Sequence, residues 1–158
     1  MDATEKRLAD LGYTLPEPFR FPKPNRTGCV RVGNLLLISG HGRNLPALPG
    51  VRASGRVGAD MTIEEGYATA RATALSILSS VKMEIGSLDR VKRVARLFGM
   101  VKVAAGFDHM PEVIDGASDL MFELFGPERG RHARTAVGMY ELPHGIAVEI
   151  NGEMEIEA

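Results

Sequence analysis

The residues best suited to chemistry are an arginine and a carboxylate near the end of the chain. Arg134 opens the run Arg-Thr-Ala-Val-Gly, and strand alternation places it on one face with the small residues Ala136 and Gly138, which leave room for a ligand. Glu149 lies in an otherwise apolar run, where a carboxylate is costly unless it is paired or at an edge. Arginine can grip a carboxylate in a planar, bidentate way, and a carboxyl group can transfer protons. Two interpretations stay open: a catalytic pair, or a structural role as an Arg134–Glu149 ion pair or as two solvated strand ends.

Other catalytic patterns are weaker. Ser39 and His41 are two residues apart, on one side of a strand, but the GxSxG elbow of many serine hydrolases is absent. Gly40-His41-Gly42 begins like a dinucleotide-binding motif, but the third glycine is missing. The four histidines have no metal-ligand spacing, and the single cysteine, Cys29, cannot form a cysteine-rich zinc site. We therefore expect no metal and no cofactor.

Length and charge restrict the class of protein. The 158 residues correspond to one domain, 1–158. Lys and Arg number 19 against 20 Asp and Glu, aromatic residues make up 6%, and tryptophan is absent. This balance argues against a nucleic-acid partner, which would need phosphate-neutralising charge and stacking platforms. No apolar run approaches the ~20 residues of a membrane helix, and the charged N-terminus is unlike a signal peptide. We therefore expect a cytoplasmic protein with no membrane partner.

The remaining patterns predict one order of elements. Residues 1–28 should form a helix over 3–12, capped by Thr4, and a proline-rich arm. A capping box at Thr62 and Glu65 starts the strongest helix, 63–85, and a second amphipathic helix should end at Gly126-Pro127. Helices are expected at 3–12, 63–85 and 110–125, and strands at 29–33, 35–39, 91–103, 134–140 and 146–156. The main body is thus ββαβαββ, an α+β fold with one mixed sheet and two helices on one face.

Several of the expected strands are apolar on both faces. Leu35 and Leu37 alternate with Leu36 and Ile38, so a sheet covered on one face would expose large aliphatic side chains. Each such side chain left in water forgoes ~1.5–3 kcal/mol. The second face should therefore pack against other copies of the chain, or else against the proline-rich arm.

From about Val30 onward the chain resembles the RidA family, also called the YjgF/YER057c/UK114 family. The most specific match is an arginine, a valine three residues later, a Leu-Pro pair and a glutamate fifteen residues after the arginine. The matching segments are 33–40, Ala70-Arg71, 86–91, Phe107, 133–137, Leu142-Pro143 and Glu149.

The resemblance implies a chorismate-mutase-like fold and a homotrimer with clefts between subunits. It implies hydrolysis of reactive enamines and imines, such as 2-imino acids, to 2-keto acids and ammonia. By the same resemblance Arg134 would hold the substrate carboxylate, and Glu149 would handle the water or proton. Ser39 and Gly40 would line the pocket with a hydroxyl and an amide.

One segment departs from the family pattern. Deaminating members carry a tyrosine before the first strand, where this chain has Asn25 or Arg26. Arg26 near the pocket would favour a larger or doubly anionic ligand. Two alternative functions follow: a non-catalytic protein that binds a small carboxylate, and an endoribonuclease, which the charge balance disfavours.

Overall fold

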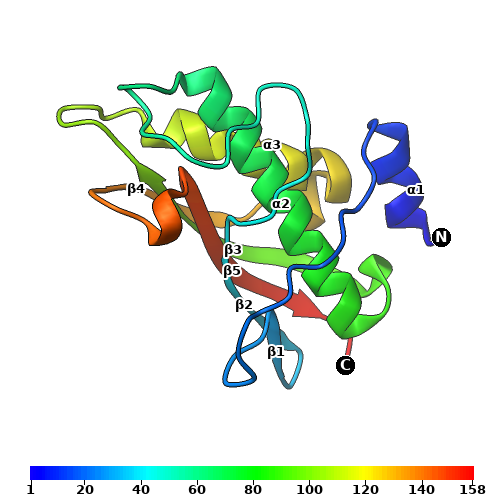
Figure 1. Ribbon diagram of the computed structural model, residues 1–158. Coiled ribbons are helices and arrows are strands. Elements are labelled where there is room, and N and C mark those ends of the chain that lie inside the picture. Colours follow the sequence, from blue (N-terminus) through cyan, green and yellow to red (C-terminus); the bar gives the residue numbers. More distant parts are fainter.

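A five-stranded sheet with helices on one side makes up the body of the protein (Figure 1). The computed structural model describes residues 1–158. In chain order its elements are α1 (Ala3–Asp10), β1 (Cys29–Val32), β2 (Leu35–His41), α2 (Ile63–Ile85), a 3₁₀ turn (Leu88–Arg90), β3 (Val91–Lys102), α3 (Met110–Arg129), β4 (Ala133–Met139), a second 3₁₀ turn (Pro143–Gly145) and β5 (Val148–Ile156).

The strands lie in the order β1-β2-β5-β3-β4. β3 and β4 are parallel and are joined by α3, while the other neighbours are antiparallel. A parallel pair needs a long crossover, and here the crossover helix α3 packs back on β3 and β4 beside α2. This confirms the expected α+β fold with a mixed sheet and two main helices on one face.

The two helices approach each other closely because small residues lie between them. A Cβ atom at Gly116 of α3 would overlap the carbonyl oxygen of Tyr67 in α2. The capping box predicted at Thr62 and Glu65 is present and starts α2. α3 extends beyond its predicted end, because Gly126, at φ 86°, interrupts the helix without ending it.

Other details differ from the prediction, since α1 ends at Asp10 and β5 begins at Val148. Asp2 caps α1 in place of Thr4, since its carboxylate accepts a hydrogen bond of 2.7 Å from the Glu5 amide. The Thr4 hydroxyl instead donates to Asp89, at 2.6 Å. β2 runs two residues further than expected, to His41. The predicted hairpin at Gly33-Asn34 is confirmed by the pairing of Val32 with Leu35.

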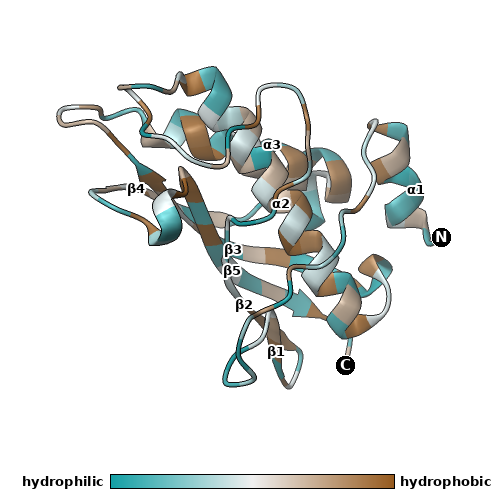
Figure 2. Cartoon of the chain, viewed as in Figure 1, coloured by the Kyte–Doolittle hydropathy of each residue, from teal (hydrophilic) through white to brown (hydrophobic).

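The proline-rich arm runs along α2 and does not cover the open face of the sheet (Figure 1). Ser79 of α2 donates a hydrogen bond of 2.6 Å to the carbonyl of Pro16. The side chains of Val30, Val32, Leu35 and Leu37 stay exposed, and Val32 has 58% of its surface in contact with solvent. β1 and β2 thus present an apolar strip with no cover from their own chain (Figure 2). No helix has the length and apolar character to cross a membrane.

His41 links the end of β2 to α2 in the core, where it is 3% exposed. Its Nδ1 lies 2.6 Å from the Ser39 carbonyl, which can only accept, so Nδ1 carries the proton. Its Nε2 lies 2.8 Å from Ser80 Oγ and accepts from that hydroxyl. Burial lowers the pKa of His41, so the ring is neutral in the folded protein.

We expect the protein to lose stability as the pH falls below ~6.5, the ordinary histidine pKa. In this range the unfolded chain binds a proton at residue 41, whereas the folded protein, with its lowered His41 pKa, does not. Thermal unfolding at pH 7.5 and 5.5 measures the effect as a fall in Tm. His41→Asn should reduce this fall, although it also lowers Tm at both pH values by leaving Ser80 without its partner.

His144→Asn is the matched control, because His144 is exposed and asparagine tolerates its positive φ of 58°. It should leave the pH dependence as in the wild type. A His41→Asn variant with the full wild-type fall in Tm would contradict the assignment.

Candidate active site

Glu149 and Gly40 form one half of the candidate site. Glu149 is the second residue of β5, beside the point where β2 and β5 change register, between Ile38 and His41. A Cβ atom at Gly40 would overlap Glu149 Oε2, so the carboxylate lies directly over this residue. Glycine is therefore needed here if the carboxylate is to lie against the backbone of β2.

A cavity of about 40 Å³ adjoins the Glu149 carboxylate, and its walls include Phe19, Gly40 and Arg43. This volume has room for water but not for a metabolite. Burial raises the pKa of Glu149, and no cation or hydrogen-bond donor opposes that rise. A half-buried carboxyl group with a raised pKa beside a water-sized cavity is suited to proton transfer.

Ser39 lies next to Gly40, but its hydroxyl is engaged. Ser39 Oγ donates a hydrogen bond of 2.5 Å to the carbonyl of Thr27, and its amide donates to Gly28 at 2.9 Å. Both bonds fix the end of the arm on β2. The His41 ring contacts the Ser39 carbonyl and not its hydroxyl, so these residues do not form a nucleophilic pair.

Arg134 forms the other half, at the start of β4. Its Nη1 donates to Asp115 Oδ1 at 2.6 Å and to Ser118 Oγ at 3.2 Å, both on α3. The Nε and Nη2 edge of the guanidinium has no protein partner. Arginine presents five donors in a fixed fork, so this edge remains able to bind a carboxylate in a bidentate way.

Sequence reasoning missed the residues that hold Arg134 in place. Ser118 Oγ lies 2.9 Å from His132 Nε2, and His132 Nδ1 lies 2.7 Å from the Gly130 carbonyl. Burial, and to a lesser extent Arg134, lowers the pKa of His132, so the neutral ring accepts from Ser118. The signal available in the sequence is the three-residue spacing of Asp115 and Ser118, which places both on one helix face.

Arg134 and Glu149 lie on opposite faces of the sheet. Arg134 is level with Leu97, a buried residue under the helices, and Glu149 is level with Met100, three residues further along β3. Three residues reverse the face, and the intervening strand puts the two Cα atoms on the order of 14 Å apart. The alternative of an Arg134–Glu149 ion pair is wrong, because the partner of Arg134 is Asp115.

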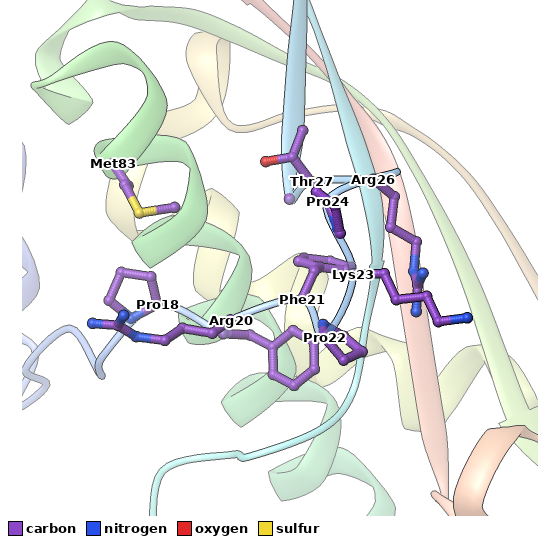
Figure 3. Close-up of a pocket in the computed structure, with 11 residues that line it drawn as sticks. Pro18, Arg20, Phe21, Pro22, Lys23, Pro24, Arg26, Thr27 and Met83 are labelled. Carbon is purple, nitrogen blue, oxygen red and sulfur yellow. The ribbon is translucent and has the colours of Figure 1, made fainter.

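The structure therefore divides the predicted site residues. Ser39, Gly40 and Glu149 come together at the junction of β2 and β5. Ala136 shares the helix-covered face with Arg134, level with Gly99 of β3. Arg26 belongs to neither group: it lines a separate pocket in the arm (Figure 3).

An aromatic side chain is nevertheless present beside Glu149. The family resemblance assigned the aromatic position to Asn25 or Arg26, but the arm brings Phe19 to the wall of the Glu149 cavity. The Phe19 ring meets Phe21 edge to face at 5.0 Å, and the Arg43 guanidinium lies 5.5 Å from its centroid. The arm thus supplies an aromatic wall from earlier in the sequence than expected.

No group of three or more His, Cys, Asp or Glu side chains is arranged to hold a metal ion. The candidate chemistry at Arg134 and Glu149 is that of charge recognition and proton transfer.

Comparison with known proteins agrees with this fold. The sequence model described as "YjgF/chorismate_mutase-like, putative endoribonuclease" matches residues 5–145. Protein TCP17 of Trypanosoma cruzi is 42% identical over 150 residues, 94% of this chain and 91% of that protein. A crystal structure described as a "putative endoribonuclease" from Shewanella oneidensis is 34% identical with a TM-score of 0.88, covering 98% of this chain and all of that one. The YjgF gene product of E. coli, 21% identical with a TM-score of 0.52, covers 92% and 96% and shares the fold.

Because burial raises the pKa of Glu149, we expect Glu149→Gln to be more stable than the wild type at pH 7. The raised folded-state pKa means that ionised Glu149 destabilises the fold, and this penalty grows as the pH rises above ~4.3, the unfolded value. The uncharged glutamine has no such penalty. The difference in Tm between the variant and the wild type should be positive at pH 7 and close to zero near pH 4.

Glu65→Gln is the matched control, because hydrogen bonds from Thr62 lower the pKa of Glu65. Its ionised form stabilises the fold, so this variant should be less stable than the wild type at pH 7. A Glu149→Gln protein that is less stable at pH 7 than at pH 4, relative to the wild type, would contradict our account of Glu149.

Proposed function

The chain belongs to the YjgF/chorismate mutase-like family, and on that premise we propose that it hydrolyses reactive enamines and imines derived from amino acids. The products are 2-keto acids and ammonia. The observation that carries the proposal is a pair of polar groups that have no protein partner. One is a guanidinium edge at Arg134 with free donors, and the other is a half-buried carboxyl at Glu149 beside a water-sized cavity.

A 2-imino acid offers one carboxylate and one electrophilic carbon, C2. The Arg134 Nε and Nη2 edge binds the carboxylate and fixes the position of C2. The imine reacts as the iminium, C=NH2+. Glu149, as carboxylate, removes a proton from water while the water oxygen bonds to C2 and the C=N π electrons move to nitrogen, so a neutral carbinolamine forms. The Glu149 carboxyl then gives this proton to the amino nitrogen. As the C–N bond breaks, the hydroxyl oxygen forms the C=O bond and its proton passes to Glu149, which gives it to the departing ammonia, so that the 2-keto acid and ammonium leave. A raised pKa makes the carboxyl a better proton donor at neutral pH than an ordinary glutamic acid.

The reaction site in this proposal lies between two copies of the chain. Arg134 and Glu149 of one copy are on opposite faces and cannot reach one small substrate. The apolar strip of β1 and β2 offers a surface for a second copy, which would bring its Glu149 towards Arg134 of the first. A closed ring of three copies, as the family resemblance implies, gives three equal clefts.

We expect Arg134→Ala and Glu149→Gln each to reduce imine hydrolysis strongly. For Arg134→Ala, the loss of charge-assisted hydrogen bonds of about 1.5–3 kcal/mol each lowers kcat/KM at least about tenfold. For Glu149→Gln, the loss of general acid–base catalysis lowers the rate by roughly 10²–10⁴-fold. In the assay an amino acid oxidase generates the imine, semicarbazide traps it, and active protein lowers the semicarbazone yield. Lys92→Ala, at an exposed position on β3, is the control and should keep wild-type activity.

Mixed oligomers test the position of the cleft. When Arg134→Ala and Glu149→Gln chains are co-expressed at equal levels, about a quarter of the clefts combine an intact Arg134 with an intact Glu149. We expect activity near that fraction of wild type, from two inactive parents. Mixed oligomers no more active than their parents would rule out a cleft shared between copies.

The imine assay, a ligand-binding measurement and an RNA-cleavage assay together separate the alternative functions. If imine hydrolysis with the wild-type protein is no faster than in buffer alone, the enzymatic proposal is wrong. Binding of 2-keto acids, seen as a rise in Tm, would then support a non-catalytic carboxylate-binding protein. RNA cleavage that depends on Arg134 would instead support the endoribonuclease activity that the descriptions of the family and of the Shewanella oneidensis protein carry.

A further inference from the structure

Three cations of the arm have no carboxylate partner. Arg20, Lys23 and Arg26 are exposed, and none of them forms an ion pair. Arg26 makes one hydrogen bond, of 2.8 Å, to the amide oxygen of its neighbour Asn25. Since the whole chain has a net charge of −1, this positive charge is a local feature of the arm.

These cations line a pocket of about 560 Å³ formed by residues 18–24 and 26–28 of the arm and by Met83 of α2. The volume is within the range of ~300–1,000 Å³ that small-molecule sites occupy. No acidic residue lines it. In Figure 3 the side chains of Lys23 and Arg26 extend to the same side of the arm, while Arg20 extends to the other. Lys23 and Arg26 are therefore the two of these cations that extend in a common direction.

The arm pocket adjoins the Glu149 cavity. Phe19 lines both of them and is their common wall. On the Glu149 side the Arg43 guanidinium stacks on this ring, 5.5 Å from its centroid, and forms no ion pair. Unpaired cations thus line both cavities, which share Phe19 and lie next to the candidate catalytic carboxyl.

We propose that the arm pocket is a subsite for a second negatively charged group of the ligand, a carboxylate or a phosphate, bound chiefly by Lys23 and Arg26. The proposal rests on the proposed function, in which Arg134 of a neighbouring copy holds the first carboxylate at the Glu149 cleft. A ligand with one anionic group leaves Lys23 and Arg26 unpaired, whereas a dianionic ligand fills both positions. The substrate class is then the imine of a dicarboxylic or phosphorylated amino acid.

Equilibrium binding of stable analogues tests the subsite. Isothermal titration of the full chain compares 2-oxobutanoate with 2-oxoglutarate, and glycerate with 3-phosphoglycerate. We expect the member with two anionic groups in at least one pair to bind about tenfold or more tightly than its counterpart with one, as one or two charge-assisted hydrogen bonds supply. The pair with the larger preference identifies carboxylate or phosphate. Because the cations are exposed, the preference should shrink at high salt.

The double variant Lys23→Gln with Arg26→Gln should reduce the preference to within about threefold and leave monoanion binding unchanged. The control, Arg31→Gln with Lys92→Gln, removes two exposed charges outside the pocket and should keep the preference. A wild type with no preference would overturn the subsite. So would a preference that survives the first variant, or one that the control also loses.

The imine assay separates this proposal from the proposed function. Imine hydrolysis without a dianion preference overturns the subsite alone, whereas a dianion preference without hydrolysis overturns the enzymatic proposal alone.

A short single-stranded RNA is titrated in parallel. RNA binding that exceeds the small dianions and is lost in the Lys23 and Arg26 double variant would assign these cations to nucleic acid and overturn the small-ligand subsite.

Discussion

Side chains alternate across a sheet that helices cover on one face only, and the position of every candidate site residue on the strands depends on this constraint. The α2 and α3 helices bury one face, so a polar residue there, such as Arg134, must be held by helix side chains. On the other face nothing compensates the burial of Glu149, whose pKa rises as a result. The same geometry therefore gives Arg134 an ion-pair partner and leaves Glu149 without one, at positions that pair with β3 residues three apart.

Much of this architecture could be predicted from local patterns. The Thr62–Glu65 capping box and the hairpin at Gly33-Asn34 depend on neighbouring residues, and both are present. The mixed sheet followed from the order of elements. Local rules predicted the ends of helices less well. Gly126 was expected to end α3, but it only interrupts the helix.

The assembly of the site could not be predicted in the same way. Whether Arg134 and Glu149 share a face depends on the register of two strands against β3, which tertiary packing sets. Family resemblance singled out both residues but not the α3 partners of Arg134, and it placed the aromatic wall at Asn25 or Arg26 and not at Phe19. The path of a proline-rich arm is determined by the surface on which it packs. Its residues show no periodic pattern from which that path could be predicted.

The arm is held in place largely by its own carbonyl oxygens, which accept from Ser79 at Pro16 and from Ser39 at Thr27. Such bonds do not depend on which side chains the arm carries, since each amino acid has the same backbone carbonyl. The side chains between these two anchors can therefore change during evolution without altering the course of the chain. Under the proposed subsite, exchange of the non-proline residues within 18–26 would change what the arm recognises, while the sheet and Glu149 would stay as they are.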